Sequence, residues 1–177
     1  MWSPVDILVR DAHRTERDAL RELTLSAYAQ YASIMEPSAW SLLRAAIVSA
    51  LDLDNGAQHI VAERKGSPLG SVLLFAPSTE AYGAVSLRTD WPEIRLLAVL
   101  PEARGLGVGR LLVNECMRRA KAGGAEAIGL HTSPSMRDAI RLYEAFGFRR
   151  DPAHDLRIEG AEPIHAYRLS LEGGAYL

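Results

Sequence analysis

The sequence predicts a mixed α/β fold, in which a central β-sheet is flanked by helices on both faces. Short apolar runs typical of strands alternate with longer segments whose apolar residues recur at the helical period. A strand–helix–strand unit in the middle of the chain requires a crossover, which places its two strands parallel. The length of 177 residues fits a single domain over 1–177, large enough to bury a core without disulfides or metals.

The N-terminal part predicts one strand followed by two helices. Residues 5–10 (VDILVR) alternate loosely between apolar and polar side chains, as a strand does. Thr15 is a candidate N-cap for a first helix, whose apolar residues recur at helical spacing across 20–34. A second helix with its own apolar stripe is predicted over 38–51, and residues 52–56 end it.

Strand signals dominate the next segment. Residues 59–64 (HIVAER) and 69–76 (LGSVLLFA) read as two strands joined by a turn at 65–68. Residues 77–92 are rich in Pro, Ser, Gly and Ala and are predicted to form a loop. Residues 93–100 (EIRLLAVL) form a strongly apolar run, which predicts a buried strand.

The C-terminal part returns to alternating helices and strands. Glycines follow each of the two helices, as expected at helix C-termini. The predicted elements are a helix at 107–122, a strand at 127–133, a helix at 135–146, and strands at 148–150 and 165–171.

Composition and charge exclude several classes of protein. A net charge of −2, with scattered arginines, gives no basic face for nucleic acid. No apolar run approaches the length of about 18 residues that a membrane span needs. Residues 1–10 lack the basic and apolar regions of a signal peptide, so we expect a cytoplasmic protein. The single cysteine, Cys116, is expected to be a small buried core residue, and no metal site is predicted.

Three alternating glycines stand where the strand at 93–100 gives way to the next helix. Gly105, Gly107 and Gly109 allow unusual backbone angles and the close approach of a ligand. The first turn of a helix adds unpaired N–H groups and a partial positive charge. Arg104 is expected to add a full positive charge at the rim. Together these features predict a pyrophosphate-binding turn.

Two common nucleotide motifs fail at specific positions. The dinucleotide fingerprint requires a sixth-position glycine, where this chain has Arg110. The P-loop requires Gly-Lys followed by Ser or Thr, and no such string is present in the sequence.

Instead, the segment resembles the Gcn5-related N-acetyltransferase (GNAT) family. The family motif is Arg or Gln, two residues, Gly, one residue, then Gly or Ala, which here reads RGLGVG from Arg104. The preceding EIRLLAVLP is similar to the strand before that motif, and LYEAFGF at 142–148 resembles the family's last helix and turn. The resemblance is specific between about 93 and 148, and it implies acetyl-CoA as co-substrate.

The resemblance also implies which residues hold acetyl-CoA. Backbone groups of one strand would pair with the pantetheine arm as an added strand does, and a backbone N–H near Val99 would polarise the thioester carbonyl. Strands that separate near Val99 and His131 would admit the thioester. The implied cofactor-binding residues are Leu97, Ala98 and Val99 on the strand, with Arg104, Gly105, Leu106, Gly107, Val108, Gly109 and Arg110 at the pyrophosphate.

Two residues are implied to carry the chemistry. Glu93 resembles the family carboxylate that deprotonates the amine through water; the alternative is a solvent-exposed carboxylate at the strand edge. Tyr143 matches a tyrosine that protonates the leaving thiolate; the alternative is a core aromatic residue. His131 is an alternative base, or else a side chain that bonds a neighbouring backbone group.

One departure from the family concerns the final helix. Many members carry Asn where this chain has Met136, so a hydrogen bond to the cofactor is lost or is supplied by Ser133 or Ser135.

The acceptor is read least clearly from the sequence. Helices over 15–53 and the loop 77–92 should contact it, and four side chains either line an acceptor pocket or belong to the core: Tyr28, Tyr31, Met35 and Trp40.

The preferred function is N-acetylation of a small-molecule primary amine by direct attack in a ternary complex. The alternatives are a protein lysine or N-terminal acetyltransferase, and a non-catalytic CoA-binding sensor. A homodimer is consistent with the fold.

Overall fold

A computed structural model describes residues 6–52, 56–77, 89–157 and 163–172. Seven strands form one mixed sheet in the order β1-β2-β3-β4-β5-β7-β6. Neighbouring strands are antiparallel except for β4 and β5, which are parallel. This mixed sheet confirms the predicted fold class. The strands are β1 (Leu8–Asp11), β2 (Gln58–Arg64), β3 (Ser67–Phe75), β4 (Glu93–Val99), β5 (Ala127–Thr132), β6 (Arg149–Arg150) and β7 (His165–Ser170).

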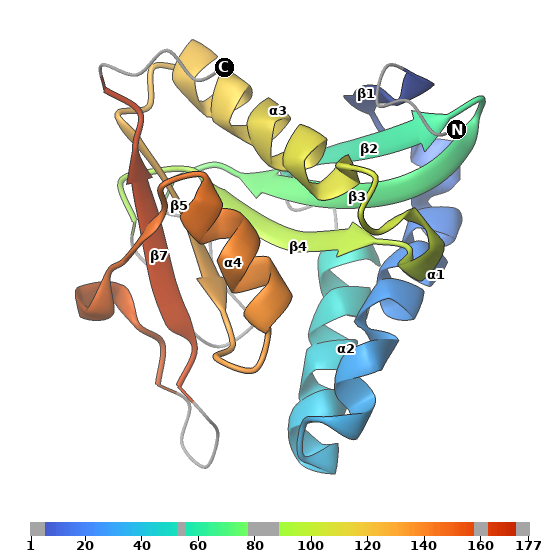
Figure 1. The fold of residues 1–177 in the computed structure, drawn as a ribbon, viewed down its shortest axis with the longest axis horizontal. Coiled ribbons are helices and arrows are strands. Elements are labelled where there is room, and N and C mark those ends of the chain that lie inside the picture. Colours follow the sequence, from blue (N-terminus) through green and yellow to red (C-terminus); the bar gives the residue numbers. More distant parts are fainter. Residues whose placement is uncertain (1–5, 53–55, 78–88, 158–162, 173–177) are drawn as a thin grey trace.

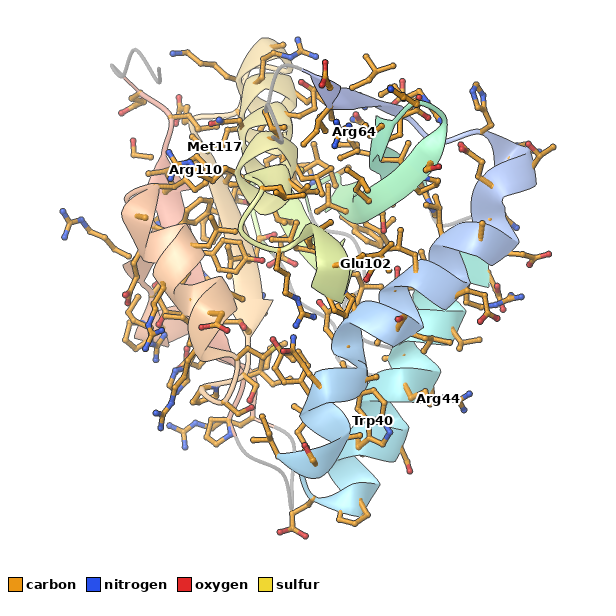
Figure 2. The ribbon with its side chains drawn as sticks, turned by 45° about the vertical axis from the view of Figure 1, so that its right-hand side comes forward. Trp40, Arg44, Arg64, Glu102, Arg110 and Met117 are labelled. Atoms are coloured by element: carbon orange, nitrogen blue, oxygen red, sulfur yellow. The ribbon has the colours of Figure 1, made fainter. Side chains whose placement is uncertain are left out.

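The helices are divided between the two faces of the sheet (Figure 1). Side chains alternate along β3, so Val72 and Leu74 pack toward α3, whereas Leu73 and Phe75 pack toward α2. Figure 2 shows the two layers from another side, with Met117 on α3 lying well apart from Trp40 on α2. The helices are α1 (Arg17–Tyr28), α2 (Pro37–Asp52), α3 (Val108–Ala122) and α4 (Arg137–Ala145). Short 3₁₀ turns are η2 (Arg14–Glu16), η3 (Ala29–Ser33), η4 (Pro101–Ala103) and η5 (Pro152–His154).

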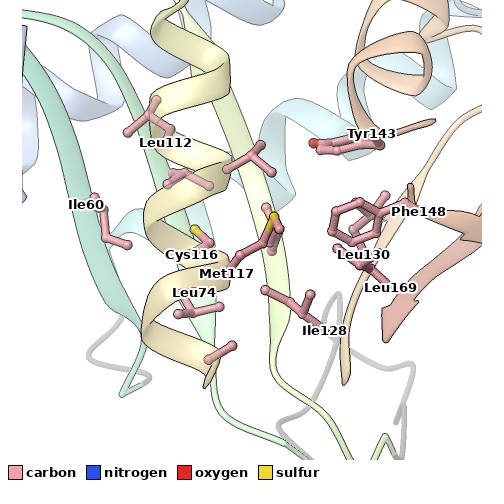
Figure 3. Packing of buried hydrophobic residues seen from close by; sticks show 14 of the residues in the cluster. Ile60, Leu74, Leu112, Cys116, Met117, Ile128, Leu130, Tyr143, Phe148 and Leu169 are labelled. Atoms are coloured by element: carbon pink, nitrogen blue, oxygen red, sulfur yellow. The ribbon is translucent and has the colours of Figure 1, made fainter. Parts of the chain in front are cut away.

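The larger core lies between the sheet and α3 (Figure 3). Leu112, Cys116 and Met117 project from one face of α3 onto β2, β3 and β5. Cys116 is fully buried, as the sequence predicted, and burial raises the pKa of its thiol to about 12. The thiol is therefore a small packing group that stays protonated.

The start of the first helix differs from the prediction. Thr15 does not cap α1, because it lies inside the 3₁₀ turn η2. The Glu16 carboxylate accepts a hydrogen bond from the His13 backbone N–H at 2.7 Å and is itself held by two hydrogen bonds from Arg10. This acid fixes an extra turn before α1, which the capping pattern at Thr15 did not reveal.

Two further boundaries differ. The apolar period predicted one helix through 20–34, but α1 ends at Tyr28 and the chain tightens into η3. The turn predicted at 65–68 contains only Lys65 and Gly66, which have φ of 50° and 81°. Two successive left-handed residues make the tight hairpin turn that matches strand twist, so β3 begins at Ser67. Most of the predicted loop 77–92 lies outside the described residues.

Two kinds of feature are absent from the described residues. None of their helices has the length and apolar character to cross a membrane. Nor do they contain a group of three or more His, Cys, Asp or Glu side chains placed to hold a metal ion.

Replacing Gly70 by Ala tests how closely β3 approaches β4 and α3. A Cβ at Gly70 would lie 2.7 Å from the Ala98 carbonyl oxygen and 2.9 Å from Val108 Cγ1. Overpacking of this kind costs about 1–3 kcal/mol, so the free energy of unfolding in urea should fall by that amount. Gly123→Ala is the matched control, because its Cβ meets two carbonyls at an ordinary 3.5 Å. Equal stabilities of the two variants would contradict the close approach.

Candidate active site

The site begins where β4 and β5 separate. The two parallel strands pair at only two positions, Glu93 with Gly129 and Ile94 with Leu130. Beyond them β5 continues to pair with β7, and no described strand pairs with the facing side of β4. Figure 1 shows the two strands diverging. The separation of strands that the family resemblance implied is therefore present.

A β-bulge explains why β4 turns away. On its other side Ser71 pairs with Ala98 and Leu73 with Arg95, so one residue of β3 faces two of β4. Leu96 in the bulge has a φ of 50°, which is uncommon for a residue with a branched side chain. A bulge bends its strand and increases its twist, and here the bend opens the sheet.

The opening continues into a cleft of about 540 Å³ between α1 and η3 on one side and α3 and α4 on the other. The predicted cofactor-binding residues that line it are Leu97, Ala98, Val99, Arg104, Gly105, Gly107, Val108, Gly109 and Arg110. Leu106 is the exception, because its side chain packs against the core. One cleft thus gathers residues from the bulged strand and from the glycine turn.

The glycine turn owes its shape to two left-handed residues. Gly105 and Gly107 have φ of 78° and 82°, and a Cβ on either would meet no atom within 4 Å. Gly107 immediately precedes α3, and no side chain caps the N–H groups of that helix. Any other residue would be strained at these two positions, yet the space beside the backbone is free. An anion-binding backbone needs such free space. Gly109 has a different role, because its Cβ would lie 3.1 Å from Leu142 Cδ2 and push α3 from α4.

The two arginines of the motif are both engaged. Arg104 donates hydrogen bonds to the Ala27 carbonyl oxygen at 3.0 Å and to Gln30 Oε1 at 3.1 Å. Its guanidinium therefore fastens the turn to the end of α1 and also lines the cleft. The Arg110 guanidinium lies 4.9 Å from the centre of the Phe146 ring, at the side of the cleft formed by α4. Figure 2 labels Arg110 near the start of α3.

Buried charges occupy the inner end of the site. Glu93 is 1 % exposed, so it is not the solvent-exposed strand-edge carboxylate considered as an alternative. Arg95 donates to Glu93 Oε2 through Nε at 3.0 Å and Nη2 at 2.9 Å, and His131 Nδ1 lies 2.8 Å from Oε1. Burial alone would raise the pKa of Glu93, but the contacts with His131 and Arg95 outweigh it and lower that pKa.

His131 and Tyr143 line the cleft, whereas Glu93 lies behind His131. Tyr143 is buried and packs edge-on against Phe148 with ring centres 5.8 Å apart (Figure 3). It therefore belongs to the core and also borders the cleft. His131 Nε2 lies 2.9 Å from the His154 carbonyl oxygen, so the histidine does bond a backbone group.

Among the four aromatic and methionine side chains considered for the acceptor, two border the cleft. Tyr28 and Tyr31 line it and pack edge-to-face at 5.7 Å, whereas Met35 and Trp40 do not reach it. Sequence reasoning missed Thr132, whose buried Oγ1 has no hydrogen-bond partner among the described residues and which lines the cleft. A threonine at a strand end carries no signal of its own, so only the fold could reveal it.

Met136 also lines the cleft where the family usually has Asn. Ser133 and Ser135, the residues considered as substitutes, hydrogen-bond each other through their hydroxyls at 2.7 Å. Neither serine lines the cleft, so Thr132 is the better-placed hydroxyl for a bound ligand.

Comparison with known proteins identifies the family. Residues 17–148 match the model of the acetyltransferase (GNAT) family. The chain therefore belongs to that family, whose members are acyltransferases that use acetyl-CoA, and the resemblance seen in the sequence is confirmed.

Individual relatives are similar over part of their length. An uncharacterized N-acetyltransferase of Schizosaccharomyces pombe is 40% identical over 49% of this chain and 56% of the relative. A mycothiol acetyltransferase of Thermomonospora curvata is 40% identical over 33% of this chain and 20% of the relative. The chain thus spans about half or less of these two proteins. A putative acetyltransferase from Salmonella typhimurium, solved with its cofactor acetyl-CoA, shares the fold, with a TM-score of 0.62, 18% identity and 97% of both chains covered.

Removing the buried carboxylate should be costly. Glu93→Ala leaves Arg95 and His131 without their acidic partner, so the free energy of unfolding should fall by about 3–5 kcal/mol at pH 7. Because the folded pKa is lowered, this stabilisation is present above the unfolded carboxyl pKa of about 4.3 and is lost as pH falls through the lower folded value. Urea unfolding at pH 7 and at a series of pH values below 4 measures both effects.

Asp18→Ala is the control, because that exposed carboxylate pairs with Arg21 on the surface of α1. Its loss should cost less than about 1 kcal/mol. A Glu93→Ala variant no less stable than Asp18→Ala would contradict the buried ion pair.

Proposed function

We propose that the protein transfers an acetyl group from acetyl-CoA to the primary amine of a small molecule, by direct attack in a ternary complex. One observation carries the proposal: a single cleft joins the glycine turn to the opened edge of β4 and ends beside Tyr143 and His131. The glycine turn and the titratable side chains of Tyr143 and His131 therefore line one cleft, as a transferase for an activated donor requires.

The chain's own residues fit the co-substrate. The open left-handed turn at Gly105 and Gly107, with the N–H groups that follow to Arg110, would hold the pyrophosphate. The unpaired side of β4 at Leu97, Ala98 and Val99 would pair with the pantetheine amides. Bound acetyl-CoA supplies the thioester carbonyl carbon that an amine attacks.

Two side chains are assigned to proton transfer. Glu93 is the base for the acceptor amine, since an amine is a nucleophile only when uncharged and a lysine-like amine has a pKa of about 10.4. Tyr143, at the wall of the cleft, donates the proton that the departing thiolate requires. Water exclusion follows from burial of the inner end, where the Glu93 and His131 side chains are each 2 % exposed.

That buried inner end also favours a small acceptor, because a bulky protein surface could not approach it closely. The relatives named mycothiol acetyltransferases point the same way, since their name refers to mycothiol and not to a protein. Acetylation of a protein lysine or N-terminus is the second candidate. A non-catalytic CoA-binding sensor is less well supported, because binding alone needs neither the buried carboxylate nor the tyrosine.

Acetyl-CoA should stabilise the protein against heat. A ligand at about 100 times its dissociation constant adds about 2.7 kcal/mol, which raises Tm by about 5–10 °C for a chain of this length. Differential scanning fluorimetry with acetyl-CoA, and with NADH and ATP as comparison ligands, measures the shift.

Gly107→Glu should abolish this shift, because it places bulk and negative charge where the pyrophosphate binds. Gly66→Glu is the matched control: its φ of 81° imposes the same backbone strain and its Cβ also meets no atom, but it lies in the β2–β3 turn. A retained shift in Gly107→Glu would count against the site, and a lost shift in both variants would indicate general damage.

Tyr143→Phe should lower turnover while leaving acetyl-CoA binding intact. Loss of one acid–base group typically costs about 10²–10⁴-fold in rate. Acetylation of a panel of small amines, with release of free thiol followed at saturating acetyl-CoA, measures it. Tyr167→Phe removes a phenol that is buried but does not line the cleft, so its rate should be unchanged. Equal rates for Tyr143→Phe and wild type would remove Tyr143 from the mechanism.

A further inference from the structure

Unsatisfied polar atoms gather at the inner end of the cleft. Among the described residues, the buried side-chain atoms without an aligned hydrogen bond are Glu93 Oε1, His131 Nδ1 and Thr132 Oγ1. The first two face each other 2.8 Å apart, at the distance of an ion pair. Buried polar groups normally have aligned hydrogen-bond partners, so a pair without them at the end of a binding cleft indicates a functional role.

The other nitrogen of His131 fixes the tautomer. Nε2 lies 2.9 Å from the His154 carbonyl oxygen, and a carbonyl oxygen can only accept a hydrogen bond. Nε2 therefore carries a hydrogen in every protonation state of the ring. Nδ1 is the variable nitrogen, and it is the one that faces Glu93.

Protonation decides whether this pair attracts or repels. With a neutral ring, the Nδ1 lone pair and the Oε1 lone pairs face each other across 2.8 Å. One added proton between the two atoms converts this repulsion into a strong, charge-assisted contact. Arg95 occupies Oε2 through two hydrogen bonds, so Oε1 is the oxygen left to share that proton.

We propose that Glu93 and His131 form a single proton-accepting unit, in which His131 is the positioning residue that holds the Glu93 carboxylate and shares the proton that it accepts. The inference rests on the proposed function, because the proton in question is that of the acceptor amine. In the transfer, an N–H bond of the amine breaks and the proton comes to lie between Oε1 and Nδ1. The electron pair left on nitrogen forms the N–C bond, the C–S bond breaks, and the sulfur takes a proton from Tyr143.

Charged and titratable neighbours of the pair come from three parts of the fold, namely β4, the η5 region and β7. Arg95 lies beside Glu93 on β4 and stacks on Phe75 of β3 at 4.2 Å. On η5, the His154 ring bonds the Asp151 carboxylate at 2.9 Å, so that acid is already occupied. Arg168 of β7 lies over Trp91, whose ring packs against His154. Of these groups, only Arg95 contacts the Glu93 carboxylate directly, which leaves Oε1 to His131.

The test compares pH profiles of kcat/KM for wild type and His131→Gln. In wild type the rate should rise as the pair loses its shared proton, in one step that belongs to both groups. In His131→Gln the carboxylate works alone, so the maximum of kcat/KM should fall at least about tenfold. The rising limb should also move to lower pH by about one unit or more, since the pKa values of free carboxyl and imidazole groups differ by about two units. His13→Gln, the same change at an exposed histidine, should match wild type.

A second measurement does not depend on turnover. ¹⁵N-edited NMR of the His131 ring should show Nε2 protonated throughout the pH range and Nδ1 protonated only at lower pH. Glu93→Gln should move that Nδ1 transition to lower pH, because it removes the negative partner. A bare Nε2 in the neutral ring, or a transition that Glu93→Gln leaves in place, would overturn the shared proton.

The outcomes separate the two proposals. A lower rate in His131→Gln with an unmoved rising limb would make His131 merely structural and overturn the inference while the proposed function stands. If no amine is acetylated at any pH, the proposed function fails and the assignment of the amine proton fails with it, whatever the ring titration shows.

Discussion

The structure depends on one local event, the bulge that turns β4 away from β5 after two residue pairs. A mixed sheet with continuous pairing would have no room between its central strands and no unpaired backbone to offer a ligand. Leu96, held at a positive φ, provides the bend. The bend leaves the backbone of β4 beyond Ile94 without a described strand partner on the side of β5, and this part of β4 lines the cleft.

The buried charges beside that passage follow from the same geometry. Glu93 begins β4 in the short paired stretch and His131 follows the last paired residue of β5, and side-chain alternation directs both to the same face. Arg95, two residues after Glu93, shares that face and neutralises one of the two carboxylate oxygens. Burying an acid here would otherwise be unfavourable by several kcal/mol, so the cluster exists because its members satisfy one another.

Much of this arrangement was predictable from residue patterns. The apolar periods gave the order of strands and helices, and the alternating glycines at Gly105, Gly107 and Gly109 located the turn before α3. Element boundaries were less predictable, because the extra turn before α1 depends on Arg10 holding Glu16, a contact between side chains that propensity does not encode. The burial of Glu93 was also invisible, since a charged residue that begins a strand is usually exposed. Its partners Arg95 and His131 are buried by parts of the chain that are distant in sequence, so their burial could not be predicted from local pattern either.

The contact made by Arg104 links the two halves of the cleft. Its guanidinium donates to the backbone carbonyl of Ala27, one residue before Tyr28, and to the Gln30 side chain in η3, while its backbone leads into the glycine turn. An occupant that shifts the turn therefore also shifts the helix end whose tyrosines border the other side. Linkage makes such an effect reciprocal. If a ligand at the turn strengthens binding at the end of α1, then a ligand at the end of α1 strengthens binding at the turn by the same free energy. In the proposed ternary complex, a single arginine would thereby couple the two binding events.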